Sequence, residues 1–272
     1  MRRKKDIFSI LLVVIVAIAY YYTEKKEKYK SEESVSVEKN NSKKNTQFNY
    51  LPSSTTGQII HHSGYSFSYN EKHEQAEWVA YSLEKDDIVY TDFKRPFFIQ
   101  DPKVKTKSAD WRNYKKSGYD KGHLCPAADR KSSKKLFNET FYTSNISPQK
   151  HNFNAGIWNK LEQKVRYWSK KYKHLYIVTG GILDHASTKT IGKEKVTVPN
   201  AFYKVILDYS EPEIKAIAFL IPHKETSAPL YNFVISIDQL EQKTGIDFFP
   251  ELPNQIENQL ESNTSYKKWS FR

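Results

Sequence analysis

β-Branched and aromatic residues recur in short stretches at both ends of the region that follows residue 50. Two such stretches come early, SGYSFSYN and AEWVAYSL, and three come late, KHLYIVTGGIL, KVTVPNAFYKVILD and IKAIAFLIPH. Residues of these types fit the pleated, half-buried surface of a sheet. The pattern therefore predicts strands toward both ends of this region.

The stretch between the two groups of strands has helical periodicity instead. In NAGIWNKLEQKVRYWSKKY the apolar side chains recur at helical spacing, at Ile157, Trp158, Leu161, Val165, Trp168 and Tyr172. We interpret Trp158 and Trp168 as core residues. A strand and then a second helix, from near Ser236 to Gly245, are predicted in APLYNFVISIDQLEQKTGID. Strands at both ends with a long helix between them indicate an α+β fold, not alternating βαβ units.

The first 22 residues differ from the rest because a basic start, MRRKK, precedes the apolar run IFSILLVVIVAIA. This run is short for a full membrane span and suits the core of a signal peptide. Ala17-Ile18-Ala19 offers a small-x-small cleavage site, whereas the tyrosines after it would extend the run into a short membrane anchor. A mitochondrial presequence fits poorly, because it should be amphipathic. Residues 1–22 are therefore predicted to be a signal peptide or a signal anchor.

Residues 23–50 are charged and polar and almost lack large aliphatic side chains, so we expect a disordered tether. From residue 51 onward the composition changes, and no repeat or second linker interrupts it. Residues 51–272 are therefore predicted to form one domain. We expect this domain to be exported, either to the periplasm or the outside, or held facing outward by residues 7–22 as a membrane anchor.

The charge balance favours anionic partners. The chain has 43 Lys and Arg against 31 Asp and Glu, which gives a net charge of +12. Such a surplus suits nucleic acid or an acidic membrane, and lysine-rich solubility is the simpler explanation. The single cysteine, Cys125, excludes an internal disulfide and a zinc finger built on cysteines. The fold must therefore rest on its apolar core.

The densest group of chemically active residues lies in YDKGHLCPAADR, which contains the consecutive residues Asp120, Lys121, Gly122 and His123. Further along, TSNISPQKHNFNAGIWNKLE places Asn154 at the entrance of the predicted helix. A histidine whose pKa is near neutrality can take a proton from water. His123 is therefore a candidate general base.

The two segments together resemble the signature of the sugar-non-specific DNA/RNA endonucleases of the ββα-metal type, Asp-Arg-Gly-His followed by a helix that contains asparagine. The resemblance covers most of residues 51–272 and includes VTGGIL and VPNAFYKVIL. It implies an α+β fold in which a ββα-metal finger is embedded in a mainly antiparallel sheet flanked by helices. It also implies a metal-dependent enzyme that hydrolyses DNA and RNA with little sequence preference and leaves 5′-phosphates.

The resemblance implies a single metal ion. Asn154 matches the direct protein ligand, and Glu162 matches a carboxylate that holds a metal-bound water. Mg²⁺ is the expected ion, with Mn²⁺ as an alternative, because Mg²⁺ accepts few protein ligands and keeps several waters. Eight helical residues rise about 12 Å. Both side chains can therefore reach one ion only if Asn154 lies before the helix proper and folds back.

Basic residues are expected to contact substrate phosphates. Lys121 stands where the family most often has arginine, so it supplies charge without a bidentate fork. Arg95, in DFKRPFF, lies where the family carries another phosphate-binding arginine, and Lys94 or Arg112 are alternatives for that position. The resemblance implies a catalytic role for Arg95, as it does for His123 and Glu162.

Arg166 follows Glu162 by four residues and shares its helix face. It is either a catalytic contact to the phosphate or the partner of Glu162 in an ordinary surface ion pair. Asp120 and Gly122 are expected to serve geometry. The carboxylate would fix the turn, and the glycine would let the backbone approach substrate or adopt a positive φ.

Other candidate residues have simpler interpretations. Asn145 is an alternative metal ligand, which we interpret as a turn or strand-end residue. His61 and His62 lack a third ligand at finger-like spacing, so we place them on the surface of a strand or loop. Cys125 is expected to be a small buried residue. Ala155 departs from the family, in which a glutamine usually follows the metal asparagine.

Two other functions use the same scaffold. A nucleic-acid-binding surface receptor that has lost its chemistry would keep a basic groove, but it should lack His123 or Asn154, and this chain has both. A phosphodiesterase for small nucleotides would keep the chemistry without needing the groove. Comparing turnover of long DNA with turnover of a dinucleotide separates these alternatives, because a basic groove helps only the polymer.

Overall fold

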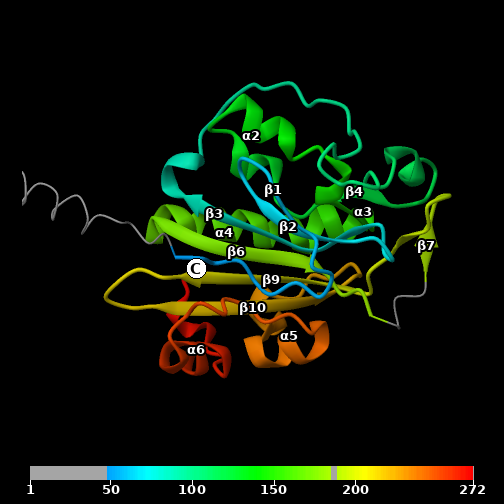
Figure 1. The fold of residues 1–272 in the computed structure, drawn as a ribbon. Helices are drawn as coiled ribbons and strands as arrows, with labels where there is room; N and C mark the ends of the chain where they lie inside the picture. The colour runs from blue at the N-terminus through cyan, green and yellow to red at the C-terminus, as the bar shows by residue number, and fades with distance from the viewer. Residues whose placement is uncertain (1–47, 185–188, 272) are drawn as a thin grey trace, which may run out of the picture. The chain divides into compact units, whose positions relative to one another are not determined.

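A seven-stranded antiparallel sheet organises residues 48–184 and 189–271, which are the residues that the computed structural model describes (Figure 1). Its strand order is β1-β2-β3-β6-β9-β10-β11. The strands are β1 (Ile59–His61), β2 (Ser66–Asn70), β3 (Gln75–Glu84), β6 (His174–Gly181), β9 (Ala201–Asp208), β10 (Lys215–Pro222) and β11 (Val234–Ile235). The expectation of an α+β fold with a mainly antiparallel sheet is thus confirmed.

Both faces of this sheet are covered, so its central strands are buried almost throughout. In β3, β6 and β9 nearly every residue is buried. The helix α4 (Asn159–Tyr172) packs on β3 and β6, whereas α5 (Ile237–Thr244) and α6 (Asn254–Glu261) pack on β10. In Figure 1, α5 and α6 lie on the side of the sheet away from β4 (Asp120–His123) and α2 (Lys134–Glu139).

The stretch KVTVPNAFYKVILD forms two strands instead of one. Its first part is β8 (Val196–Thr197), which pairs with β7 (Thr190–Ile191), and its second part is β9. Pro199 lies between them, and proline has no N–H to donate to a ladder. The break moves the chain from the small β7–β8 ribbon to the central sheet.

The predicted central helix is present, and it begins irregularly. A short helix α3 (His151–Phe153) leads into a π-helical turn, Asn154–Trp158, which then continues as α4. Gly156 has φ −93° and ψ −111°, which lies outside helical values. Trp158 and Trp168 are fully buried, as predicted.

The predicted helix near the C-terminal end is confirmed at both boundaries. The side chain of Ser236 accepts a hydrogen bond from the backbone N–H of Gln239, as an N-cap does. Gly245 ends α5 with φ +68°, a conformation that favours glycine. The helix α6 was not predicted from the sequence.

The remaining elements are short. β4 pairs with β5 (Ile146–Gln149) in a two-stranded ribbon. Single 3₁₀ turns occupy Lys85–Asp87, Trp111–Tyr114, Ala127–Arg130, Thr143–Asn145, Leu230–Phe233 and Tyr266–Lys268. Within the described ranges, no helix combines the length and apolar character that crossing a membrane requires. The predicted signal segment, residues 1–22, and all but residues 48–50 of the predicted tether lie outside the described residues.

One surface prediction is wrong. His61 is exposed on β1, but the His62 side chain is buried and its Nε2 lies 2.7 Å from a carboxylate oxygen of Asp101. The His62 ring also stacks on Phe67 and Tyr142, with ring centroids 5.8 and 4.9 Å apart. The burial of His62, which follows β1, could not be read from the sequence because its partners Asp101 and Tyr142 are distant along the chain.

Candidate active site

The ribbon of β4 and β5 holds the Asp-Lys-Gly-His motif. Gly122 pairs with Ser147, and Asp120 pairs with Gln149. A Cβ atom on Gly122 would lie 2.5 Å from Cγ of Gln149 and closer still to Cδ and Oε1. Gly122 does not have a positive φ. The expectation of a turn or a positive φ at this glycine is therefore wrong, and the close side chain of Gln149 explains why no Cβ fits here.

A cavity of about 380 Å³ brings the predicted site residues together. Lys121 and His123 come from β4, and Arg95 comes from the loop before it. Three other candidates line the cavity and follow β5 in the chain. They are Asn154 in the π-helical turn and Glu162 and Arg166 on α4. Neither Lys94 nor Arg112 lines this cavity, and Arg112 pairs with Asp110 at 2.8 Å.

His123 is half-buried between two aromatic rings. Its ring centroid lies 5.5 Å from that of Phe98 and 5.1 Å from that of Phe141. Burial, followed by the charge of Arg95, lowers the pKa of His123 to about 3. Its Nε2 has no hydrogen-bond partner among the described residues. The imidazole is therefore neutral at neutral pH, which leaves one ring nitrogen without a proton.

Asp120 orients the side chain of Asn154. The Nδ2 of Asn154 donates a hydrogen bond of 3.0 Å to Oδ2 of Asp120, and Nδ1 of His151 lies 2.9 Å from the same oxygen. An ionised carboxylate only accepts hydrogen bonds, so it selects the amide nitrogen and leaves the amide oxygen for another partner. Asp120 thus lies in a strand and not in a turn, which corrects the expectation from the sequence.

The π-helical turn explains how Asn154 and Glu162 come to line one cavity. The segment has a kink at Gly156, whose φ and ψ are not helical, so Asn154 and Glu162 are not separated by eight regular helical steps. Both residues line the same cavity. Helical side chains also point back toward the N-terminus, which directs Glu162 toward Asn154. Asn154 lies before α4, as the sequence analysis required.

A buried group of charges lies beside the cavity. Arg166 pairs with Asp129 at 2.8 Å instead of with Glu162, so the simple ion pair considered above is not formed. Lys204 on β9 is fully buried, and its Nζ lies 4.9 Å from the centre of the Trp158 ring. Desolvation raises the pKa of Glu162 to about 7, with Lys204 lowering it and Asp129 raising it. Desolvation also lowers the pKa of Lys204.

Sequence reasoning did not find Lys204 or Asp129. A signal was present for Lys204, because it stands inside the apolar strand AFYKVILD, where a charge must be paired or have a special role. Asn145 does not line the cavity. It is buried at the end of a 3₁₀ turn and hydrogen-bonds with the backbone of Cys125 and Thr140, which confirms its structural interpretation. Cys125 is buried as expected.

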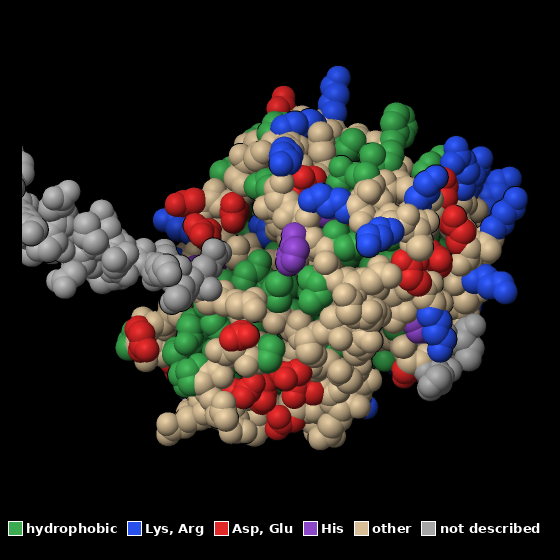
Figure 2. Space-filling view, viewed as in Figure 1, with side chains coloured by type: hydrophobic (Ala, Val, Ile, Leu, Met, Phe, Trp, Pro, Cys, Tyr) green, Lys and Arg blue, Asp and Glu red, His purple; other side chains and the backbone are tan. Residues whose placement is uncertain are grey.

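Two cations stand over the rings that enclose His123. The Nζ of Lys121 lies 5.3 Å from the centre of the Phe98 ring, and the guanidinium of Arg95 lies 5.5 Å from that of Phe141. Figure 2 shows Lys and Arg side chains gathered over the upper and right-hand part of the molecule, around β4 and β7. The wall of the cavity is itself basic, because Arg95, Lys121, Lys131 and Arg166 all line it.

Comparison with known proteins identifies several relatives. The zebrafish (Danio rerio) protein "Nuclease EXOG, mitochondrial" is 34% identical over 227 residues, which cover 78% of this chain and 66% of the relative. Human "Endonuclease G, mitochondrial" is 29% identical, with 72% of this chain and 70% of the relative covered. "Nuclease C1" of Cunninghamella echinulata is 32% identical over 73% of this chain and 85% of its own length. The matches span 56–66% of the length of the EXOG relatives.

These names contradict the expectation of an exported protein. EXOG, endonuclease G and the yeast relative are named mitochondrial nucleases. The expectation rested on a basic start and an apolar run, and these two properties do not distinguish one target membrane from another. The prediction of a periplasmic, extracellular or outward-facing location is therefore wrong.

The fold agrees with the same relationship. The structure of EndoG in the EndoG/EndoGI complex matches with a TM-score of 0.67 and 28% identity, covering 73% of this chain and 88% of that chain. Two antiparallel strands, β4 and β5, followed by the helical segment 151–172, form the ββα unit that the sequence motif implied. A model of the DNA/RNA non-specific endonuclease family matches residues 41–255. The chain belongs to the DNA/RNA non-specific endonuclease family.

Proposed function

We propose that residues 51–272 form an endonuclease domain that hydrolyses the phosphodiester bonds of DNA and RNA with little sequence preference. The observation that carries this proposal is that His123 and Asn154, from separate sequence motifs, line one cavity. The neutral imidazole and the oriented amide both suit their proposed roles there. The mitochondrial names of the relatives support a mitochondrial location for this chain.

The donor atoms at the cavity fit a divalent cation. The family is metal-dependent in general, and the oxygen of the Asn154 amide and the carboxylate of Glu162 are the hard ligands that Mg²⁺ prefers. We propose Asn154 as the direct ligand and Glu162 as a ligand through water, with Mn²⁺ able to use the same oxygen atoms. When bound, the cation would stabilise negative charge on the phosphate and on the leaving oxygen.

His123 is proposed as the general base. A ring nitrogen of the neutral imidazole would accept a proton from the attacking water, which bonds to phosphorus in line with the bond to the 3′ oxygen. That bond then breaks and the leaving 3′ oxygen takes a proton from solvent water, so the products carry a 5′-phosphate and a 3′-hydroxyl. Packing against Phe98 and Phe141 limits the motion of the imidazole during this step.

Lys121 and Arg95 are proposed to hold substrate phosphates at the cavity mouth. Arg166 commits one nitrogen to Asp129, and its remaining donors are proposed to contact the phosphate. Contacts to phosphates carry no base identity, which accounts for weak sequence preference. Binding should also weaken steeply as salt rises, because counterions are released when phosphates are neutralised.

Incubation of the purified full chain with supercoiled DNA or with RNA tests the proposal. Cleavage with Mg²⁺, its loss with EDTA, and 5′-phosphate ends on the products are the expected results. His123→Ala should lower kcat by about 10²–10⁴-fold while the protein stays folded. His61→Ala serves as the matched control, because His61 is exposed on β1 and does not line the cavity.

Intact DNA and RNA after incubation across neutral pH would exclude the enzyme and leave a binding protein on the same scaffold. Cleavage of a dinucleotide as fast as of long DNA would indicate a small-nucleotide phosphodiesterase instead.

A further inference from the structure

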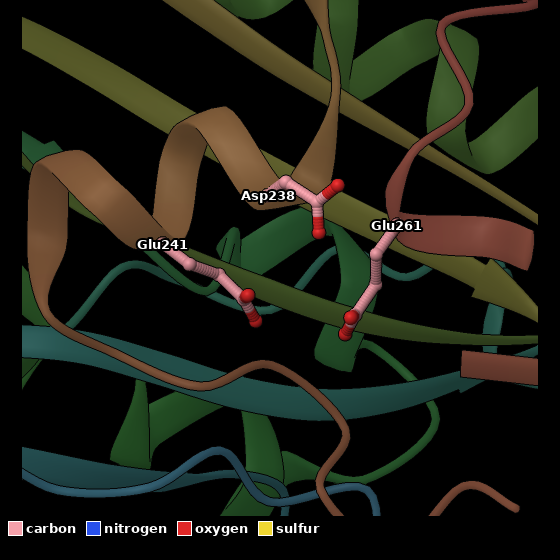
Figure 3. Close-up of side chains that lie close together, drawn as sticks. All are labelled: Asp238, Glu241 and Glu261. Carbon is pink, nitrogen blue, oxygen red and sulfur yellow. The ribbon is translucent and has the colours of Figure 1, made fainter. Parts of the chain in front are cut away.

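A second group of carboxylates lies between α5 and α6, away from the nuclease cavity. Asp238 and Glu241 belong to α5, and Glu261 ends α6. Figure 3 shows the three side chains extending into the same space, and one oxygen from each lies within 4.8 Å of the others. Asp247 and Glu257 form a second such group with Glu261, so Glu261 joins all five residues.

Glu261 has a carboxylate oxygen that lacks a partner. Only 9% of the residue is exposed, and Oε1 is buried with no hydrogen bond to any described residue. A buried carboxylate oxygen left in this state destabilises a fold unless something binds it. Burial, followed by the charges of Glu241 and Glu257, raises the pKa of Glu261 to about 8.

The like charges around Glu261 have no cationic partner in the described part of the chain. None of the five carboxylates forms an ion pair with a described Lys, Arg or His. Asp238 and Glu241 are three residues apart on one helix face, and Glu257 and Glu261 are four apart on another, spacings at which like charges repel. Figure 2 shows acidic side chains gathered over α5 and α6, although the chain as a whole is basic.

We propose that Asp238, Glu241 and Glu261, with Asp247 and Glu257 at the edge of the site, bind one Ca²⁺ ion. Ca²⁺ takes six to eight oxygen ligands at about 2.3–2.6 Å, so oxygens on opposite sides of the ion are up to about 5 Å apart. The three carboxylate oxygens lie within 4.8 Å of one another, so one Ca²⁺ ion can contact all three. Mg²⁺ takes few protein ligands and keeps most of its waters, so it suits a group of up to five carboxylates less well.

The proposed ion would tie the last helix to the rest of the domain. It would join α5 to α6, which both pack on β10, on the side of the sheet away from β4 (Figure 1). Its role is therefore to stabilise the fold and not to take part in hydrolysis. A ligand that binds only the folded state raises the thermal midpoint in proportion to the logarithm of its concentration.

Calorimetric titration of the full chain with CaCl₂ tests the site. Asn154→Ala is used as the background, because it removes the direct ligand proposed for the nuclease cavity. After removal of metals with EDTA, this variant should bind one equivalent of Ca²⁺, bind Mg²⁺ at least tenfold more weakly, and melt at a higher temperature when Ca²⁺ is present.

Two further variants in the same background locate the site. Glu261→Gln and Asp238→Asn should each weaken Ca²⁺ binding at least tenfold and remove the rise in thermal midpoint, and both should fold because they relieve repulsion between like charges. Glu251→Gln is the matched control, since Glu251 is exposed and outside the cluster, and it should bind as its parent does. No saturable Ca²⁺ binding, equal binding of Mg²⁺, or undiminished binding in both variants would overturn the proposal.

Discussion

Gly122 lies directly beneath the side chain of Gln149, so Gly122→Ala tests how firmly the β4–β5 ribbon positions His123. The added Cβ would lie 2.5 Å from Cγ of Gln149, whereas unstrained carbon atoms stay about 3.5–4.0 Å apart. Gln149 is fully buried, so its side chain cannot swing into solvent. The two strands must therefore separate by about 1 Å to bring the Cβ–Cγ distance from 2.5 Å to about 3.5 Å.

The expected effect has two parts. Overpacking of this kind destabilises a fold by about 1–3 kcal/mol, and each kcal/mol lowers the thermal midpoint of a domain of this size by about 2–4 °C. His123 is the next residue, and a displacement of about 1 Å at a reacting group can lower the rate about 10²-fold. We therefore expect a lower midpoint together with a kcat that falls between about tenfold and 10²-fold.

Calorimetry and plasmid cleavage with Mg²⁺ measure the two effects. A double-mutant cycle supplies the control, because Gln149→Ala removes the side chain that Gly122→Ala would meet. The double variant should recover most of the kcat that the single Gly122 variant loses. An unchanged midpoint and kcat in Gly122→Ala, or a double variant no better than the single one, would refute the reasoning.

Three further predictions follow from the same geometry. Asp120→Asn should weaken Mg²⁺ binding about 10–100-fold without unfolding the protein. The new amide can bond either the nitrogen or the oxygen of the Asn154 side chain, so it no longer keeps the oxygen free for the metal. Measuring the cleavage rate as a function of Mg²⁺ concentration tests this. The low pKa of His123 means that the unfolded state alone takes up a proton between about pH 6.5 and about pH 3, so stability falls as pH falls through this window. His123→Gln should therefore lose less of its thermal midpoint between pH 7.5 and 4.5 than the parent chain. Lys204→Met should raise the pKa of Glu162 further and move the acid limb of the pH–rate profile to higher pH, and an unmoved limb would contradict this.

The strands and the helix boundaries were predictable where local chemistry decides the structure. β-Branched and aromatic residues indicated β3, β6 and β10, and the polar cap Ser236 and the glycine at 245 marked both ends of α5. Pro199 is also a local signal for the end of a strand, but whether it interrupts pairing depends on the neighbouring strand. The sequence analysis therefore joined β8 to β9.

The candidate site was predictable as a set of residues and not as an arrangement. The sequence named Arg95, Lys121, His123, Asn154, Glu162 and Arg166, and all six line one cavity. Periodicity could not show the kink at Gly156, because the apolar spacing of α4 after it is regular. It also could not show that Arg166 pairs with Asp129, because the choice between two carboxylates depends on tertiary packing.

The kink at Gly156 ties the proposed metal ligand to the core. Deleting one residue at position 155 or 156 would change the winding of this segment, and the backbone before it would rotate by about 100°. Asn154 would then leave the cavity, and the fully buried Phe153 would lose its contacts with Trp158 and Phe202. A lineage could therefore not discard the metal ligand by this deletion without also weakening the core, so loss of activity by this route would be accompanied by loss of stability.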